Sequence, residues 1–161
     1  MRRVWSPRGV RAIATQRPRY QWLYVYAFAR PDSGEVFWLL LPSVSSALFS
    51  IALREFAEDV EAGPDRRIVL VLDGAGWHKA RDLQIPEGIH LVFQPAHSPE
   101  LQPCERLWNP LTEPVANRAF DSLDQLEQVI TDRCLALIDE APRLRSLTLY
   151  HWWEAAIAGV P

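Results

Sequence analysis

Apolar runs and turn-rich polar segments alternate along the chain in an order that predicts an α/β fold. Four runs have the length and composition of strands, at residues 21–29, 36–41, 68–72 and 89–93. Helical spacing of apolar residues predicts helices over about 46–60, 103–115 and 123–137, and a short last helix docked by the aromatic residues 150–153. This order of elements predicts a mixed sheet flanked by helices.

Two of these helices carry recognisable start signals. The first should begin at a serine cap within residues 43–46 and end before Gly63, and the third shows a capping box made by Ser122 and Gln125. The apolar positions of the first helix predict a buried face made of Leu48, Ile51, Ala52, Phe56 and Val60.

The strand at 68–72 leads to the first candidate functional residue. Its five apolar residues without a break predict a strand that is buried on both faces of a parallel sheet, and Asp73 follows it directly. Gly74 and Gly76 allow the chain to turn away, and ligand sites in open α/β sheets lie beyond such strand ends. Asp73 is therefore a candidate ligand or catalytic residue.

A second candidate carboxylate, Glu105, falls in the first turn of the helix that starts at Pro103. Glu105 lies at the edge of the apolar stripe of this helix, so it can face a cleft, and Pro110 and Pro114 predict a kink or break further along. Two carboxylates on adjacent elements can hold a divalent cation, and their oxygen ligands suit Mg²⁺ or Mn²⁺. The residues expected to face the core are Cys104, Leu107, Trp108, Leu111 and Val115.

The segments VLDGAGWHKA and PAHSPELQPCERLW resemble the second and third acidic motifs of the DDE transposases, in particular the bacterial insertion-sequence enzymes related to mariner. The resemblance runs from Trp5 to about Phe120 and implies a ribonuclease H-like catalytic domain. It assigns Asp73 and Glu105 as catalytic carboxylates and ligands of Mg²⁺ or Mn²⁺. Gln102 stands where many members have asparagine as the helix cap, and glutamine is a poorer cap.

The resemblance also implies the chemistry and the partners. In the family, two metal ions held by three carboxylates activate water or a 3′ hydroxyl for attack on a DNA phosphodiester. Transposon ends and target DNA are the expected partners, with a homodimer as a further candidate. His78 matches a histidine of the motif, and with Lys79 it is a candidate to contact a phosphate or to support the metal ligands. The alternatives are a locally bonded turn histidine and a solvated lysine.

The third carboxylate of the family has no counterpart in the sequence. The first catalytic aspartate of the family precedes a segment like RRVWSPRG, with which this sequence begins, and the first acid here, Asp32, sits in a Pro-Asp-Ser-Gly hairpin turn. We therefore expect a ribonuclease H-like sheet that lacks its first strand. The expected organisation is a single incomplete domain, with a basic lead-in at 1–20, a core at 21–120 and C-terminal helices at 121–161.

Two interpretations of this missing carboxylate remain open. In the first, the chain alone is inactive and an aspartate-bearing strand is encoded within about 20 residues upstream. In the second, the chain is a non-catalytic relic that only binds DNA or a protein partner.

Charge is distributed unevenly. The net charge of −3 argues against a nucleic-acid protein, yet residues 1–31 contain seven arginines and no acid, which leaves ten basic and twenty acidic residues in the rest. The basic segment is a candidate phosphate-contacting arm, and its alternative is a solvated terminus. The candidate DNA-binding residues are Arg2, Arg3, Arg8, Arg11, Arg17 and Arg19.

The cysteine content predicts a reduced, cytoplasmic protein, and the resemblance implies a bacterial protein associated with the nucleoid. Cys104 and Cys134 are too few for a disulfide framework and lie in predicted helices. Residues 36–53 contain no charge, but Pro42 and four serines interrupt them, so they predict a strand and a helix and no membrane span.

Other active sites receive little support from the spacing of the residues. A nucleophile pair of His97 and Cys104 lacks a third orienting group. A zinc site of Asp73, His78 and His97 matches no helix-borne zinc motif. We expect His90 and His151 to be surface or core histidines, and Trp77 and Trp108 to pack in the protein.

Overall fold

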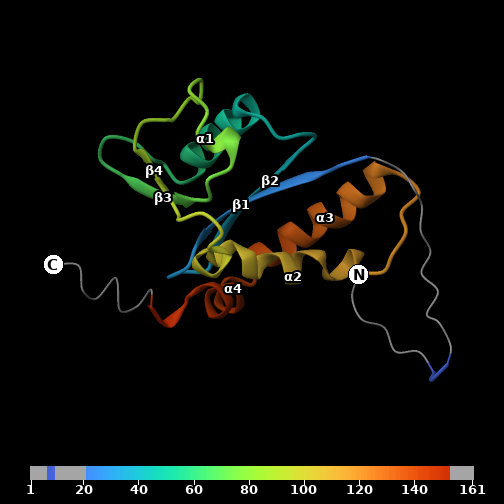
Figure 1. Cartoon of the computed structure of the whole chain (residues 1–161). Coiled ribbons are helices and arrows are strands. Elements are labelled where there is room, and N and C mark those ends of the chain that lie inside the picture. Colours follow the sequence, from blue (N-terminus) through green and yellow to red (C-terminus); the bar gives the residue numbers. More distant parts are fainter. Residues whose placement is uncertain (1–6, 10–20, 153–161) are drawn as a thin grey trace.

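The computed structural model describes residues 7–9 and 21–152, and its elements follow the predicted order (Figure 1). The strands are β1 (Tyr24–Arg30), β2 (Glu35–Leu41), β3 (Ile68–Leu72) and β4 (Ile89–Phe93). The α-helices are α1 (Ser46–Asp59), α2 (Trp108–Thr112), α3 (Leu123–Ile138) and α4 (Ala141–Thr148). Four short 3₁₀ helices are η1 (Gly76–His78), η2 (Pro99–Leu101), η3 (Pro103–Leu107) and η4 (Glu113–Val115).

The β1–β2 hairpin separates two helical layers. Its strands are antiparallel in a register that pairs Tyr24 with Leu41 and Arg30 with Glu35, and the predicted turn joins them. Helix α1 lies on one side of the hairpin, and α2, α3 and α4 lie on the other (Figure 1). Because side chains alternate between the faces of a strand, each strand of the hairpin contributes to two different cores.

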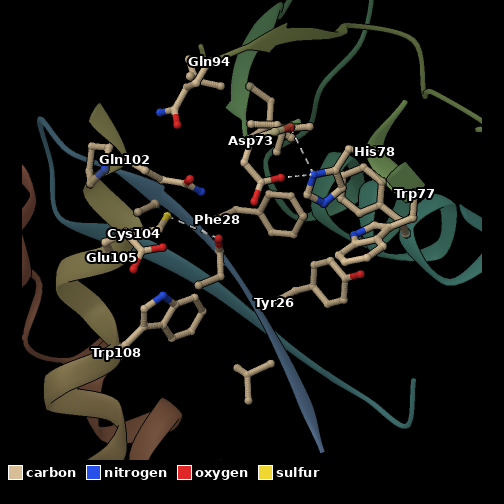
Figure 2. Close-up of a pocket in the computed structure, with 18 of the residues that line it drawn as sticks. Tyr26, Phe28, Asp73, Trp77, His78, Gln94, Gln102, Cys104, Glu105 and Trp108 are labelled. Carbon is tan, nitrogen blue, oxygen red and sulfur yellow. Dashed lines mark hydrogen bonds and ion pairs between the residues drawn. The ribbon is translucent and has the colours of Figure 1, made fainter. Parts of the chain in front are cut away.

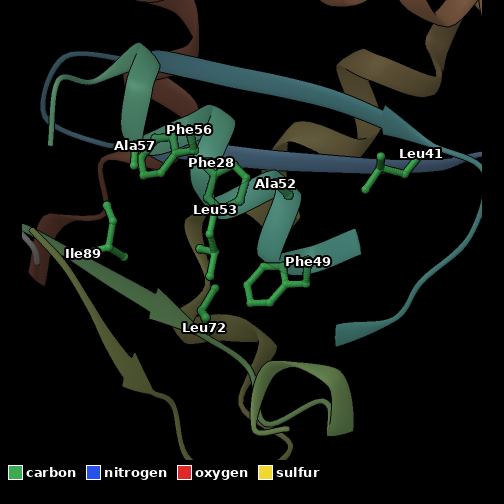
Figure 3. Packing of buried hydrophobic residues seen from close by; sticks show 9 residues of the cluster. All are labelled: Phe28, Leu41, Phe49, Ala52, Leu53, Phe56, Ala57, Leu72 and Ile89. Carbon is green, nitrogen blue, oxygen red and sulfur yellow. The ribbon is translucent and has the colours of Figure 1, made fainter. Parts of the chain in front are cut away.

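The first core lies between α1 and both strand pairs (Figure 3). Phe28 of β1 stacks on Phe56 of α1 with ring centroids 4.5 Å apart, and Tyr26 stacks on Phe49 at 5.8 Å. Leu72 and Ile89 add the apolar face of β3 and β4. This cluster therefore fixes β3, and the residue that follows it, against α1.

The second core lies between the opposite face of the hairpin and the C-terminal helices. The buried residues of α3 are Ile130, Cys134 and Leu137. Ser122 forms the predicted cap of this helix by accepting a hydrogen bond from the Gln125 backbone amide at 3.2 Å. Leu107 and Leu111 pack into the same cluster. The elements that carry Glu105 are thereby fastened to the hairpin.

The buried face of α1 differs from the prediction. Ser45 caps the helix as expected, and Ala52 and Phe56 are buried, but Ile51 is 37% exposed. The helix is apolar around most of its first two turns, so the sequence alone leaves two neighbouring stripes to choose from. The hairpin selects the stripe made of Phe49, Ala52, Leu53, Phe56 and Ala57.

Strands β3 and β4 pair in parallel, as predicted, but the expectation that β3 is buried on both faces is wrong. Val69 is 64% exposed, whereas Leu72 is buried. The second core covers the face of the hairpin that is turned away from α1, and it contains no described residue of β3 or β4. An apolar surface therefore remains on the strand that leads to Asp73.

The expected mixed sheet is divided in two. Among the described residues, β1 pairs only with β2 and β3 pairs only with β4, so the antiparallel and parallel parts form separate two-stranded sheets. The expected helix around Glu105 is also divided, into η3, α2 and η4. Proline fits the first turn of a helix but not its interior, which explains why α2 stops at Thr112, before Pro114.

None of the helices described for residues 7–9 and 21–152 is long and apolar enough to cross a membrane.

Candidate active site

Asp73 directly follows β3, and its carboxylate is held in a turn. Its Oδ1 accepts a hydrogen bond from the Ala75 amide at 3.1 Å and lies 2.7 Å from Nδ1 of His78. An ionised carboxylate can only accept, so Nδ1 carries the proton in this contact. The Asp73 side chain is 57% exposed, and it can therefore bind a further ligand.

His78 is the buried member of this pair. Its residue is 9% exposed, and its ring lies 4.4 Å from the ring of Phe49 and 5.6 Å from that of Trp77. The short helix η1 packs against α1 and brings this ring into contact with Asp73. Such burial gives His78 the geometry of a residue that orients Asp73 and leaves little room for direct contact with a phosphate.

Glu105 faces the same cavity as Asp73 (Figure 2). The cavity measures about 320 Å³ and lies between β1, β3 and η3. Pro103 begins η3, and Gln102 occupies the cap position without a side-chain capping bond, as expected for glutamine. The Gln94 side chain donates to the Leu101 carbonyl at 3.0 Å and holds the approach to η3 against the end of β4.

Cys104 lines the cavity from η3 and closes one edge of β1. Its thiol donates to the Ala27 carbonyl at 3.5 Å. Burial raises the pKa of Cys104 to about 11 and the pKa of Cys134 to about 11. Both thiols are free and protonated near neutral pH, so Cys104 is unsuited to the role of a nucleophile.

Tyr26 is a polar residue of the cavity that the sequence did not single out. Burial, and secondarily the charge of Asp73, raises the pKa of its hydroxyl above the ordinary value of 10.0. The hydroxyl oxygen is buried without a hydrogen-bond partner in the described part of the chain. Tyr26 reads as an ordinary strand tyrosine, so its position could be found only from the fold.

The donor set fits a hard divalent cation but is small. Asp73 and Glu105 offer carboxylate oxygens, the ligands that Mg²⁺ and Mn²⁺ prefer. Within the described residues, no three His, Cys, Asp or Glu side chains come together as a metal site. Asp32 is bonded to Arg30 at 2.8 Å in the hairpin turn, and His97 is exposed outside the cavity. The zinc site therefore finds no support among these residues.

Other predicted residues lie outside the cavity. Lys79 is exposed, with its ammonium 4.9 Å from the centre of the Phe93 ring. Arg8 is exposed, and the remaining candidate arginines fall outside the described residues: Arg2, Arg3, Arg11, Arg17 and Arg19.

The predicted histidines and tryptophans are placed as follows. His90 and His151 are exposed. Trp108 packs against the second core, and Trp77 is 37% exposed at the cavity. Trp108 thus confirms the expectation of packing, whereas Trp77 keeps an exposed edge.

Comparisons with known proteins agree with this arrangement. The chain is 33% identical over 135 residues to the uncharacterized protein y4pE/y4sA of Sinorhizobium fredii. The alignment covers 81% of this chain and 96% of that protein. Two solved structures share the fold. The Mos1 transposase paired-end complex with left transposon end has a TM-score of 0.58 and 20% identity, and the Mos1 strand transfer complex has 0.55 and 18%.

The overlap with the Mos1 structures is one-sided. It includes 98% and 92% of this chain, respectively, but this chain spans about half of each Mos1 chain, 49% and 50%. The fold is thus that of the ribonuclease H-like part of those proteins. Residues 1–127 match the family described as DDE superfamily endonuclease. With most of its length matched, this chain belongs to the DDE superfamily endonucleases.

Proposed function

We propose that this chain is a transposase catalytic domain that binds Mg²⁺ or Mn²⁺ through Asp73 and Glu105 and acts on DNA phosphodiesters by cleavage and strand transfer. The observation that carries the proposal is that these two carboxylates, from the end of β3 and from η3, line one cavity. Membership of the DDE superfamily endonucleases supports the same assignment.

The residues of the cavity have separate tasks in this proposal. A bound divalent cation supplies Lewis-acid stabilisation of the charge that develops on phosphate oxygens. Asp73 and Glu105 hold the cation, and His78 keeps the Asp73 carboxylate in one orientation through the 2.7 Å contact. Supporting contacts of this kind commonly tune metal affinity.

DNA is the proposed partner. The two Mos1 structures are a strand transfer complex and a paired-end complex with a transposon end, which supports DNA binding by this related chain. The arginines of residues 1–19 are proposed to contact phosphates without reading the base sequence. A homodimer and an association with the bacterial nucleoid belong to the same proposal.

We propose a specific place for a third carboxylate in this architecture. The Ala27 carbonyl points to Cys104 and away from β2. Backbone N–H and C=O groups of successive residues point to opposite edges of a strand. The backbone groups of Val25, Ala27 and Ala29 therefore face the cavity. In β3, the Ile68 amide donates to the Gly88 carbonyl and the Leu72 carbonyl accepts from the Gln94 amide, so these groups point toward β4. By the same rule, the backbone groups of Val69 and Val71 face the cavity.

The two strand edges that lack a strand partner among the described residues therefore line one gap. We propose that an extended segment fills this gap and brings the third carboxylate beside Asp73 and Glu105. With two carboxylates only, we expect weak metal binding and little cleavage.

The alternative is a chain that keeps the fold and binds DNA or a protein partner without catalysis. This alternative requires no metal site, so metal binding separates the two functions.

Manganese titration of the purified chain, followed by the electron paramagnetic resonance of the free ion, tests the proposed site. We expect weak binding that is reduced further by Asp73→Asn and by Glu105→Gln, since each removes one anionic ligand. Glu127→Gln, an exposed carboxylate on α3 away from the cavity, is the matched control and should bind like the wild type. Equal binding by all four proteins would exclude the proposed site.

A further inference from the structure

A second concave surface lies behind the Asp73 turn. It is an open groove of about 570 Å³, and His78 contributes to both this groove and the carboxylate cavity. Besides His78, its lining includes three nitrogen-bearing side chains, two exposed large apolar side chains and no carboxylate. These five are Lys79, Arg81, His90, Ile85 and Phe93.

The described arginines divide into those that pair with a carboxylate and those without an acidic partner. Five of the eleven described arginines pair with a carboxylate: Arg30, Arg54, Arg66, Arg133 and Arg143. Neither Lys79 nor Arg81 makes an ion pair among the described residues. The neighbouring Asp82 instead accepts a hydrogen bond from the Ser46 hydroxyl at 3.0 Å. Two cations without an acidic partner give this groove a local positive charge in a chain whose net charge is −3.

Lys79 connects the groove to the carboxylate site. A Cβ added to Gly74 would lie 2.9 Å from the Lys79 ammonium, so this charge sits over the residue next to Asp73. The same ammonium lies over the Phe93 ring, which keeps it inside the groove. A phosphate held by Lys79 is therefore a near neighbour of a phosphate held at Asp73.

We infer that this groove binds the DNA backbone on one side of the phosphodiester that occupies the carboxylate cavity, with Lys79 and Arg81 contacting phosphates. The inference rests on the proposed function for the identity of the polymer. Exposed Ile85 and Phe93, at 50% and 38%, offer apolar contact to sugar or base. The groove is formed by residues 78–93, which are separate in sequence from the N-terminal arginines.

The test compares the salt dependence of DNA binding by the full chain and by Lys79→Gln/Arg81→Gln. Fluorescence anisotropy with a labelled 20-base-pair duplex, without added metal, gives the affinity at several salt concentrations. Each lost phosphate contact should reduce the slope of log K against log salt by about 1, so the slope of the double variant should be smaller by about 2. The double variant should also bind at least about tenfold more weakly at low salt.

Arg67→Gln is the matched control, because Arg67 is exposed, outside the groove and without an ion pair among the described residues. It should leave the slope unchanged. The groove is excluded if the double variant binds like the wild type, or if Arg67→Gln weakens binding equally. Deletion of residues 1–19 should lower the affinity for DNA. Adding Lys79→Gln/Arg81→Gln to the chain without residues 1–19 should lower the affinity further. Because the assay contains no metal, loss of the metal site would leave this result intact.

Discussion

At the residue scale, the contact between His78 and Asp73 decides how the candidate ligand is presented. A buried imidazole and a turn amide hold one carboxylate oxygen, so the carboxylate is fixed before any cation arrives. Such preorganisation matters more in a site with few ligands, since each remaining ligand must be correctly placed.

Tyr26 provides a prediction about stability at this scale. Its buried hydroxyl has no partner among the described residues, and an unsatisfied buried hydroxyl costs about 1–3 kcal/mol. Tyr26→Phe should therefore leave the free energy of unfolding unchanged or raise it by about 1 kcal/mol. Urea unfolding at pH 8 measures this, with Tyr24→Phe as a control on the same strand.

The pH dependence of the same variant gives an independent check. The pKa of Tyr26 is raised in the folded chain, so its neutral form stabilises the fold below pH 10, and this stabilisation is lost as the pH rises past 10. The advantage of Tyr26→Phe should grow between pH 8 and pH 10.5. A variant clearly less stable than the wild type at both pH values would show that the hydroxyl has a partner.

At the element scale, the turn between β1 and β2 is the docking point of α4. Gly34 has φ of +81°, and a Cβ there would lie 2.0 Å from the Ala141 carbonyl oxygen. Arg145 of α4 donates to the Asp32 carbonyl at 2.8 Å in the same turn. The helix and the turn therefore touch through their backbones.

Gly34→Ala should destabilise the chain by more than about 1 kcal/mol, because it combines backbone strain with a clash. Thermal unfolding measures the effect. Gly63→Ala serves as the control, since a Cβ at Gly63 meets nothing within 4 Å. Similar losses in both variants would contradict the close contact of α4 with the turn.

Elements with a single strong signal were predictable from the sequence. The hairpin turn, the cap of α3 and the strand before Asp73 each follow from local residue chemistry. The buried face of α1 did not, because two apolar stripes compete and only the hairpin selects between them. Helix α4 was not located, since it is only eight residues long and Pro142, Arg143 and Arg145 leave it with few apolar side chains.

The residues of the candidate site were likewise only partly predictable from the sequence. Asp73 and Glu105 were found from their motifs, and the structure places both at one cavity. Tyr26 and the groove cations could not be assigned in advance, because their role depends on the packing of segments that are distant in sequence. Exposure of Val69 also follows from packing, as strand composition does not show how many faces are covered.

At the scale of the whole molecule, the gap between β1 and β3 predicts a measurable pattern of amide exchange. We expect an N-terminally extended chain that includes an aspartate-bearing strand to protect the amides of Val25, Ala27, Ala29, Val69 and Val71. The amides of even-numbered residues should change little, since they already bond to β2 or β4. Hydrogen exchange followed by NMR resolves the alternation.

The same extended chain should nick supercoiled DNA with Mn²⁺, whereas its Asp→Ala variant should keep the amide protection and lose the nicking. Robust cleavage by residues 1–161 alone would contradict the need for a third carboxylate. Protection of even and odd residues alike would contradict insertion between the two edges.

The β1–β2 hairpin also governs how the molecule comes apart. Its two faces belong to different cores, so melting of either core leaves one face of the hairpin in water and weakens the other core. Because the two cores share the hairpin, we expect them to unfold together and not as separate cooperative units. The amides that pair β1 with β2 are therefore expected to exchange only on global unfolding. Damage to the C-terminal helices should weaken the first core through the shared hairpin, and with it the placement of Asp73.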